Sequence, residues 1–248
     1  MNKKKIITLT LIFLASLEAS CSSIYPKPNQ EVKVQEKKIE KKVKKINEEK
    51  INKTVPITVV NRPISWSENR EKLIREYAQM HYNKNITRII PQVVIVHWTA
   101  SEDCDSVYQY FYNETMEDDG GGRLNVASHF LVDKDGTIYA LTPENALNRH
   151  AIGYNWCAIG IENVGGSEGK ENLTEAQAKA NIDLIKYLKS KYSTIGYVWG
   201  HYQQNEAKAS GLFIENVPDY YADKIDPGEK FMLQLKAGLK KEKLRFYI

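Results

Sequence analysis

The sequence predicts an α/β domain over residues 56–248, in which helices flank a central mixed β-sheet. Helical patterns alternate in this part of the chain with short apolar and β-branched runs, as expected for a sheet covered by helices. One such run, residues 92–98, is too continuously apolar for an edge strand, so we expect it inside the sheet. The chain has 248 residues, and one domain of ordinary size leaves an additional segment at its N-terminus.

Capping and turn residues support the individual elements. Ser67 is a good N-cap residue for the first helix, and Thr174 with Gln177 forms a capping box for a long one. A Lys-Asp-Gly turn at residues 134–136 lies between two apolar segments and predicts a β-hairpin. The expected order is a helix at 67–80, a strand at 92–98, a helix at 105–112 capped by Asp105 or Ser106, a flexible loop at 117–122, the hairpin at 127–140, a strand at 157–164, a helix at 174–191, a strand at 195–200 and a helix that begins at 226–228 and ends near 240.

Residues 1–21 have the pattern of an export signal. Lysines at residues 3–5 precede an apolar run at 6–17, which is shorter than the roughly 20 residues that a membrane-spanning helix needs. The cysteine directly after Ala-Ser resembles the signal of bacterial lipoproteins, although Glu18 stands where such signals usually have an apolar residue. We therefore predict lipidation at Cys21. Plain secretion and an uncleaved signal anchor are the alternatives.

Residues 22–55 form a Lys/Glu-rich segment with too few apolar residues to fold alone. A solvated spacer is the preferred interpretation over a lone helix or weak coiled coil. Residues 1–55 contain 13 lysines and 6 glutamates, a net charge of +7; because the whole chain carries +4, residues 56–248 carry −3. A mildly acidic domain argues against nucleic acid as its partner. The spacer would hold this domain away from a membrane.

Two of the five histidines, His97 and His201, each follow a β-rich run and are expected at a strand end. Ligands of α/β sheets gather beyond the strand ends. A histidine there could pack, act as a base or bind a metal, and the spacing alone leaves these options open. A catalytic zinc site needs three N or O ligands and one open position. Asp226, which precedes Pro227 on a turn ahead of a helix, is the candidate third ligand.

Residues 60–240 resemble the zinc-dependent N-acetylmuramoyl-L-alanine amidases, which share a fold with the peptidoglycan recognition proteins. The stretches that carry the resemblance are NRPISWSENREKLIREYAQMHY, VVIVHWTAS, SHFLVDKDGTIYAL, NRHAIGYNWCAIGIENVGG and KIDPGEKF. The resemblance implies one zinc ion held by His97, His201 and Asp226. It also implies two catalytic residues, Glu162 as the proton-transferring base that faces the metal and Lys224 as an assisting cation.

The resemblance implies further residues around this site. It places His150 and Asn155 in contact with substrate, and His129 in a structural or supporting position. His81 lies far from any motif in the sequence and is expected to be structural. Some relatives use a tyrosine in catalysis where this chain has Ser128, which favours the arrangement with a glutamate.

The function implied is hydrolysis of the amide between N-acetylmuramic acid and L-alanine of peptidoglycan, in cell-wall remodelling, turnover or recycling. We expect no cofactor beyond zinc, a monomer, peptidoglycan or muropeptides as the partner, and a lipid-anchored location facing the periplasm or cell wall. The alternatives are a non-catalytic peptidoglycan-binding lipoprotein of the same fold and a zinc peptidase that cuts within the stem peptide.

Two further features remain open at this level. Cys104 and Cys157 could form one disulfide in an exported protein, but the sequence does not show whether they are close. The stretch 202–223 is longer than in the shortest relatives and is expected to form a loop at the rim of the cleft. Its paired Tyr220 and Tyr221 could stack on sugar rings or pack inside the protein.

Overall fold

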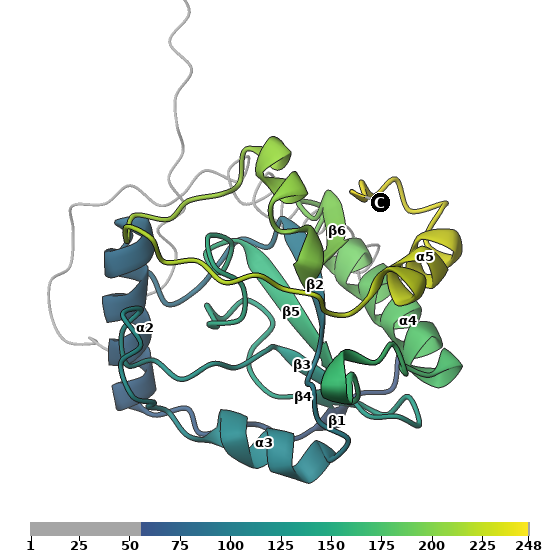
Figure 1. Ribbon diagram of the computed structural model, residues 1–248, viewed down its shortest axis with the longest axis horizontal. Coiled ribbons are helices and arrows are strands. Elements are labelled where there is room, and N and C mark those ends of the chain that lie inside the picture. Colours follow the sequence, from purple (N-terminus) through teal and green to yellow (C-terminus); the bar gives the residue numbers. More distant parts are fainter. Residues whose placement is uncertain (1–55, 248) are drawn as a thin grey trace, which may run out of the picture. The chain divides into compact units, whose positions relative to one another are not determined.

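The computed structural model describes residues 56–247; the predicted signal, Cys21 and the spacer lie outside the described residues. Residues 56–247 form a six-stranded sheet with helices around it (Figure 1), which confirms the predicted fold class. The strands are β1 (Val60–Asn61), β2 (Val93–Trp98), β3 (Phe130–Val132), β4 (Ile138–Ala140), β5 (Ala158–Asn163) and β6 (Tyr197–Gly200). The α-helices are α2 (Glu68–Tyr82), α3 (Cys104–Tyr112), α4 (Glu175–Lys191) and α5 (Glu229–Gly238).

The sheet is mixed, and its order is β1-β4-β3-β5-β2-β6. The hairpin strands β3 and β4 pair antiparallel, whereas β1 with β4, β3 with β5, β5 with β2, and β2 with β6 pair parallel. β2 therefore lies between two neighbours, and all six of its residues are buried. This confirms that the apolar run at 92–98 forms an interior strand.

The helix caps agree with the sequence at two helices and differ at a third. Ser67 caps α2, and the capping box of Thr174 and Gln177 is present at α4. At α3 the N-cap is Asp103, whose carboxylate accepts hydrogen bonds from two backbone N–H groups near the start of the helix. The prediction that Asp105 or Ser106 caps this helix was wrong, because these two residues supply the N–H groups that Asp103 binds.

Alternation along the strands gives the sheet two different faces. Val94 and Val96 of β2 belong to the main core, to which α4 and α5 contribute Leu184, Ile185, Leu188, Met232 and Leu235. Burial of a side chain of this size stabilises the fold by about 1.5–3 kcal/mol. The opposite face of β2 carries Val93, Ile95 and His97. In Figure 1, α4 and α5 lie together on one side of the sheet and α2 lies on the other.

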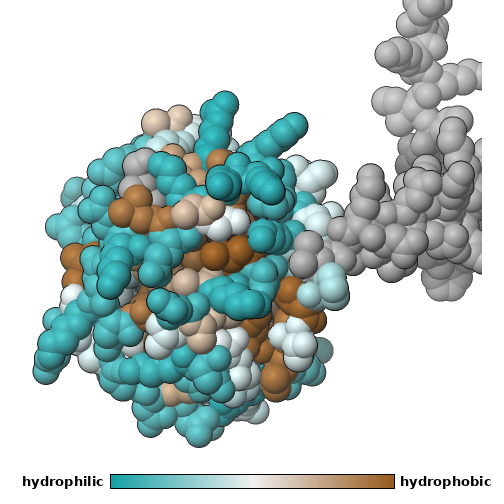
Figure 2. Space-filling model, turned by 90° about the vertical axis from the view of Figure 1, so that its right-hand side faces the viewer, coloured by the Kyte–Doolittle hydropathy of each residue, from teal (hydrophilic) through white to brown (hydrophobic). Residues whose placement is uncertain are grey.

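The surface above α4 and α5 is mostly hydrophilic, with small separate apolar areas (Figure 2). Across residues 56–247, no helix combines the length and the apolar character needed to cross a bilayer. Cys104 and Cys157 are both free thiols, so the disulfide that the sequence left open is not formed. Burial raises the pKa of each thiol, which makes both less reactive.

Candidate metal centre

His97 and Glu162 are brought together by the register of β2 and β5. In this parallel pair His97 lies directly opposite Glu162. The preceding residues Val96 and Ile161 face the main core, so alternation turns His97 and Glu162 to the other face. His97 is only 1% exposed, and its carbonyl accepts a hydrogen bond of 3.0 Å from the side chain of Asn163. This bond fixes the backbone at the end of β2.

His201 and Asp226 meet at the end of β6, which is parallel to β2. His201 begins a short 3-10 turn directly after Gly200. The next residue, Tyr202, donates its backbone N–H to the carbonyl of Asp226 at 2.9 Å. A Cβ atom on Gly200 would lie 2.7 Å from Cδ of Pro227. Glycine at this position thus allows the Asp-Pro turn to approach the strand end.

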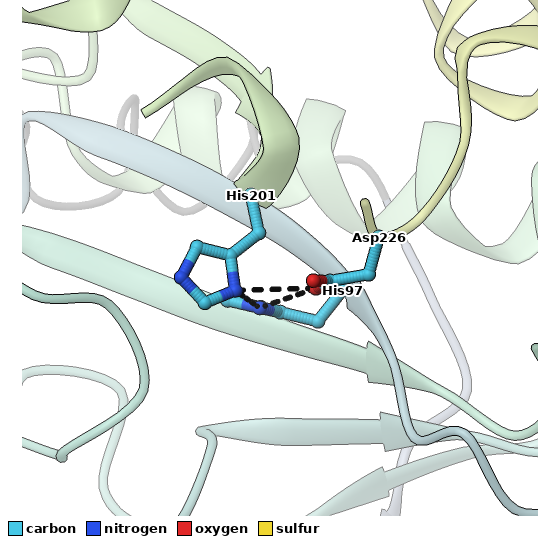
Figure 3. Close-up of side chains that lie close together, drawn as sticks. All are labelled: His97, His201 and Asp226. Atoms are coloured by element: carbon cyan, nitrogen blue, oxygen red, sulfur yellow. Dashed lines mark hydrogen bonds and ion pairs between the residues drawn. The ribbon is translucent and has the colours of Figure 1, made fainter. Parts of the chain in front are cut away.

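Three ligand atoms converge from these separate segments (Figure 3). Nδ1 of His97 lies 3.0 Å from Nδ1 of His201 and 3.1 Å from Oδ2 of Asp226, and the third separation, from His201 to Asp226, is 3.2 Å. All three side chains are buried. The structure thus brings together the three residues expected to bind metal.

The electrostatics of this group suit metal binding. Burial favours a higher pKa for Asp226, but hydrogen bonds and charge from His201 and His97 outweigh it and hold this pKa well below its usual range. Burial, with a smaller effect of His97, lowers the pKa of His201 to about 4. Asp226 is therefore a carboxylate, and His201 is a neutral imidazole at neutral pH. These are the protonation states in which such side chains bind metals.

The three atoms fit a zinc ion in number, chemistry and spacing. Zinc binds histidine nitrogen at about 2.0–2.1 Å and carboxylate oxygen at about 2.0–2.2 Å, so two ligands of one tetrahedral ion stand about 3.3 Å apart. The observed separations of 3.0–3.2 Å are close to this value. Two imidazoles with one carboxylate are typical of catalytic zinc sites, which keep a fourth position for water or substrate.

Glu162 and Lys224 line the same cavity as the three candidate ligands; we call it the central cavity. Oε2 of Glu162 is buried and has no hydrogen-bond partner among residues 56–247. Burial raises the pKa of Glu162 well above its ordinary value, the charge of Asp226 adds to this, and Lys224 opposes it. A buried carboxyl group with a raised pKa, beside a candidate metal site, is suited to proton transfer.

His150 and Asn155 also lie at the site, in different ways. Nδ1 of His150 is 3.1 Å from Nε2 of His97. Asn155 is fully buried; its Oδ1 accepts hydrogen bonds from the backbone N–H groups of His150 and Ala151, and its Nδ2 donates to the hydroxyl of Tyr77. These bonds tie the Asn155 amide to the surrounding protein. Contact of His150 and Asn155 with substrate stays a prediction.

The remaining histidines, His129 and His81, are buried and form hydrogen bonds that connect separate segments of the chain. His129 is buried; its Nε2–H donates to a backbone carbonyl and its Nδ1 accepts from the backbone N–H of Gly160. Burial lowers the pKa of His129 to about 4. His81 is also buried, with Nδ1 2.8 Å from the Glu215 carboxylate and Nε2 3.0 Å from the carbonyl of Gly121. It joins α2 to two loops, which the isolated position of His81 in the sequence did not indicate.

Loop 117–122, expected to be flexible, is held by a buried arginine. Arg149 forms an ion pair of 2.6 Å with Asp119 of this loop, and it donates a second bond of 2.6 Å to the hydroxyl of Tyr220. Tyr220 is therefore committed to a contact within the protein. Its neighbour Tyr221 is 48% exposed. Both tyrosines line a second cavity that adjoins the central one, in agreement with a loop at the cleft rim.

The sequence did not indicate the residues that fix the backbone of the candidate ligand His97 through hydrogen bonds. Asn181 of α4 donates a hydrogen bond of 2.7 Å to Asn163, which in turn donates to the carbonyl of His97. No local pattern marks these asparagines, because their partners are distant in sequence. Gly160 could have been found, since a glycine inside a strand often marks a close approach of another group.

The fold and the site combine a mixed α/β sheet with a candidate metal centre at its strand ends. Residues 87–229 match the model of the family described as N-acetylmuramoyl-L-alanine amidase, and the chain belongs to this family. It is therefore an amidase of the class that acts on peptidoglycan.

Individual proteins are similar to parts of this chain. The endolysin of Enterobacteria phage T3 is 32% identical over 109 residues, which are 42% of this chain and 71% of the phage protein. Peptidoglycan recognition protein 3 of Mus musculus is 30% identical over 131 residues, which are 50% of this chain and 37% of the mouse protein. A solved structure of the endolysine N-acetylmuramoyl-L-alanine amidase LysCS from Clostridium intestinale URNW shares 23% identity with a TM-score of 0.48, over 74% of this chain and 95% of that chain.

Proposed function

We propose that the protein is a zinc-dependent amidase that hydrolyses the bond between the lactyl group of N-acetylmuramic acid and L-alanine of the stem peptide. The observation that carries this proposal is the convergence of His97, His201 and Asp226 within 4.8 Å of one another. Glu162 and Lys224 line the cavity in which these atoms meet. A chain of this family that retains all five side chains is equipped for catalysis as well as for binding.

The roles of these side chains follow from their chemistry and position. Zinc, when held by the three ligands, supplies Lewis acidity that activates water at neutral pH and polarises a carbonyl oxygen. Glu162 takes a proton from the attacking water and passes it to the amide nitrogen as the C–N bond breaks. Lys224 supplies positive charge for the oxygen of the tetrahedral intermediate. The products are a lactyl carboxylate and the free amine of L-alanine.

A digest of purified sacculi tests this function. We expect stem peptides with a free L-alanine amine and glycan with intact N-acetylmuramic acid, both detected by mass spectrometry. A chelator should stop the release, and added zinc should restore it. A parallel digest of soluble muropeptides shows whether the substrate is the intact wall or its turnover fragments.

Two results of that digest would contradict the proposal. Fragments cut inside the stem peptide would indicate a zinc peptidase. Stoichiometric zinc without any release of peptide, from sacculi or from soluble muropeptides, would indicate a protein that only binds peptidoglycan.

The proposed place of action is the cell envelope, where the protein acts as a monomer anchored through a lipid on Cys21. The signal-like residues 1–21 and the polar spacer support this, as does a family that acts on the cell wall. In cell fractionation, Cys21→Ser should move the exported protein from the membrane to the soluble fraction. A Cys21→Ser protein that stays in the membrane would point to an uncleaved signal anchor. A wild-type protein in the soluble fraction would point to plain secretion.

A further inference from the structure

We propose that His150 is a positioning residue that fixes the orientation and the tautomer of His97 as a metal ligand. The inference rests on the proposed metal site but not on the reaction carried out there. It assigns His150 to the support of the metal rather than to the recognition of substrate.

The hydrogen-bond partners of His150 determine which of its nitrogens carries hydrogen. Nε2 of His150 lies 3.3 Å from the carbonyl oxygen of Ala158. A carbonyl can only accept, so this nitrogen is the donor and Nδ1 is left as the acceptor of the ring. Nε2 of His97, 3.1 Å from that Nδ1, must then donate. His97 is thereby held with its free lone pair on Nδ1, the atom that faces His201 and Asp226.

The position of the His150 ring is built into β5. A Cβ atom on Gly160 would lie 2.8 Å from Cγ and from Nδ1 of His150, so the ring occupies the space that a side chain at residue 160 would need. His129 contacts the ring edge to face, with centroids 5.8 Å apart. The backbone N–H of His150 donates to Asn155 at 2.9 Å. The strand, a second histidine and the loop amide together define one location for this ring.

His201 shows what a ligand without such support looks like. Its Nε2 is buried and has no hydrogen-bond partner among the described residues. The orientation of His201 therefore depends on packing and on the contacts of its Nδ1 with His97 and Asp226. The His97 ring, in contrast, is oriented by a hydrogen bond on the side away from the metal position. Outer partners of this kind typically contribute 10–100-fold to metal affinity.

A role in substrate binding is the competing explanation, because His150 also lines both cavities. The two explanations predict different measurements. A positioning residue changes the zinc dissociation constant in the absence of substrate. A substrate contact changes KM and leaves zinc affinity unaltered.

The test is a chelator competition that measures zinc affinity of the full chain without substrate. His150→Leu removes the acceptor and should weaken zinc binding by about 10–100-fold. His150→Asn, whose side-chain oxygen can replace Nδ1 as acceptor, should recover most of the loss. Gly160→Ala removes no polar group but displaces the ring, so it should weaken zinc as well. Tyr221→Leu, on the wall of the second cavity, is the matched control and should bind zinc like the wild type.

The zinc dissociation constants of these variants distinguish a positioning role of His150 from a contact with substrate. If His150→Leu and Gly160→Ala bind zinc with the wild-type constant, the positioning role is wrong, and a raised KM in the same variants would assign His150 to substrate. If His150→Leu does not fold, Gly160→Ala carries the test: weaker zinc binding supports the positioning role, and the wild-type constant overturns it. If the wild-type protein itself binds no zinc, the proposed function fails, which is distinct from failure of the inference about His150 alone.

Discussion

The Glu162→Gln variant is expected to bind zinc like the wild type and to lose catalytic rate by about 10²–10⁴-fold, the usual contribution of a proton-transferring side chain. Glutamine keeps the size of glutamate but cannot take a proton from water. Glu162 lies outside the group of His97, His201 and Asp226, so the variant leaves the candidate ligands intact. Zinc content per chain and kcat on muropeptides are the two quantities to measure.

Glu168→Gln is a suitable control for this experiment. It makes the same chemical change at a glutamate whose side chain is 76% exposed and whose ion-pair partner within residues 56–247 is another exposed residue, Lys170. Its rate should equal that of the wild type. If Glu162→Gln retained the full rate, Glu162 would not be the base, and another group at the cavity would have to move the proton.

The His97→Ala variant is expected to lose both zinc and amidase activity. Removal of this imidazole leaves two of the three converging ligands and opens the centre of the group. Any ligand that binds the folded state alone raises its stability. Zinc should therefore raise the Tm of the wild type and leave that of the variant unchanged. Metal analysis, thermal unfolding with and without zinc, and release of stem peptides together check this expectation.

A result that separates zinc from His97 would contradict the site. His97→Ala with one zinc per chain and a wild-type rate would remove His97 from the centre. The wild type treated with chelator is the matching control, because it should reproduce the variant's inactivity and, unlike the variant, recover when zinc is added.

The fold could be predicted from the sequence because its signals are local. The unbroken apolar run before His97 indicated an interior strand, and the capping box at Thr174 indicated the start of α4; both are confirmed. Even the error at α3 was local, because Asp103 and Asp105 are both good capping residues and the structure uses the earlier one. Such features depend on a few neighbouring residues.

The site was harder to predict because it depends on contacts between distant residues. Strand ends at His97 and His201 could be read from the apolar runs, but the register that places Glu162 opposite His97 could not. Asp226 lies 25 residues after His201 in the sequence. The residues between them show no periodic pattern that would indicate that the two side chains meet. For these positions the resemblance to the amidase family supplied what the residue pattern alone left open.

Contacts between distant residues also explain why the sequence did not define the roles of Tyr220, Tyr221 and His150. Tyr220 and Tyr221 are adjacent and chemically identical, yet one is bonded to Arg149 and the other is exposed. The role inferred for His150 requires the carbonyl of Ala158 and the bare backbone of Gly160, whose contacts exist only in the folded chain. Three-dimensional contact, rather than residue type, distinguishes these positions.

The most direct test of the proposed zinc centre is anomalous diffraction from crystals grown with zinc, recorded on both sides of the zinc absorption edge. One zinc peak is expected at about 2.0–2.2 Å from Nδ1 of His97, Nδ1 of His201 and Oδ2 of Asp226. An active protein whose crystals show no zinc at this position, or zinc held by other residues, would contradict it.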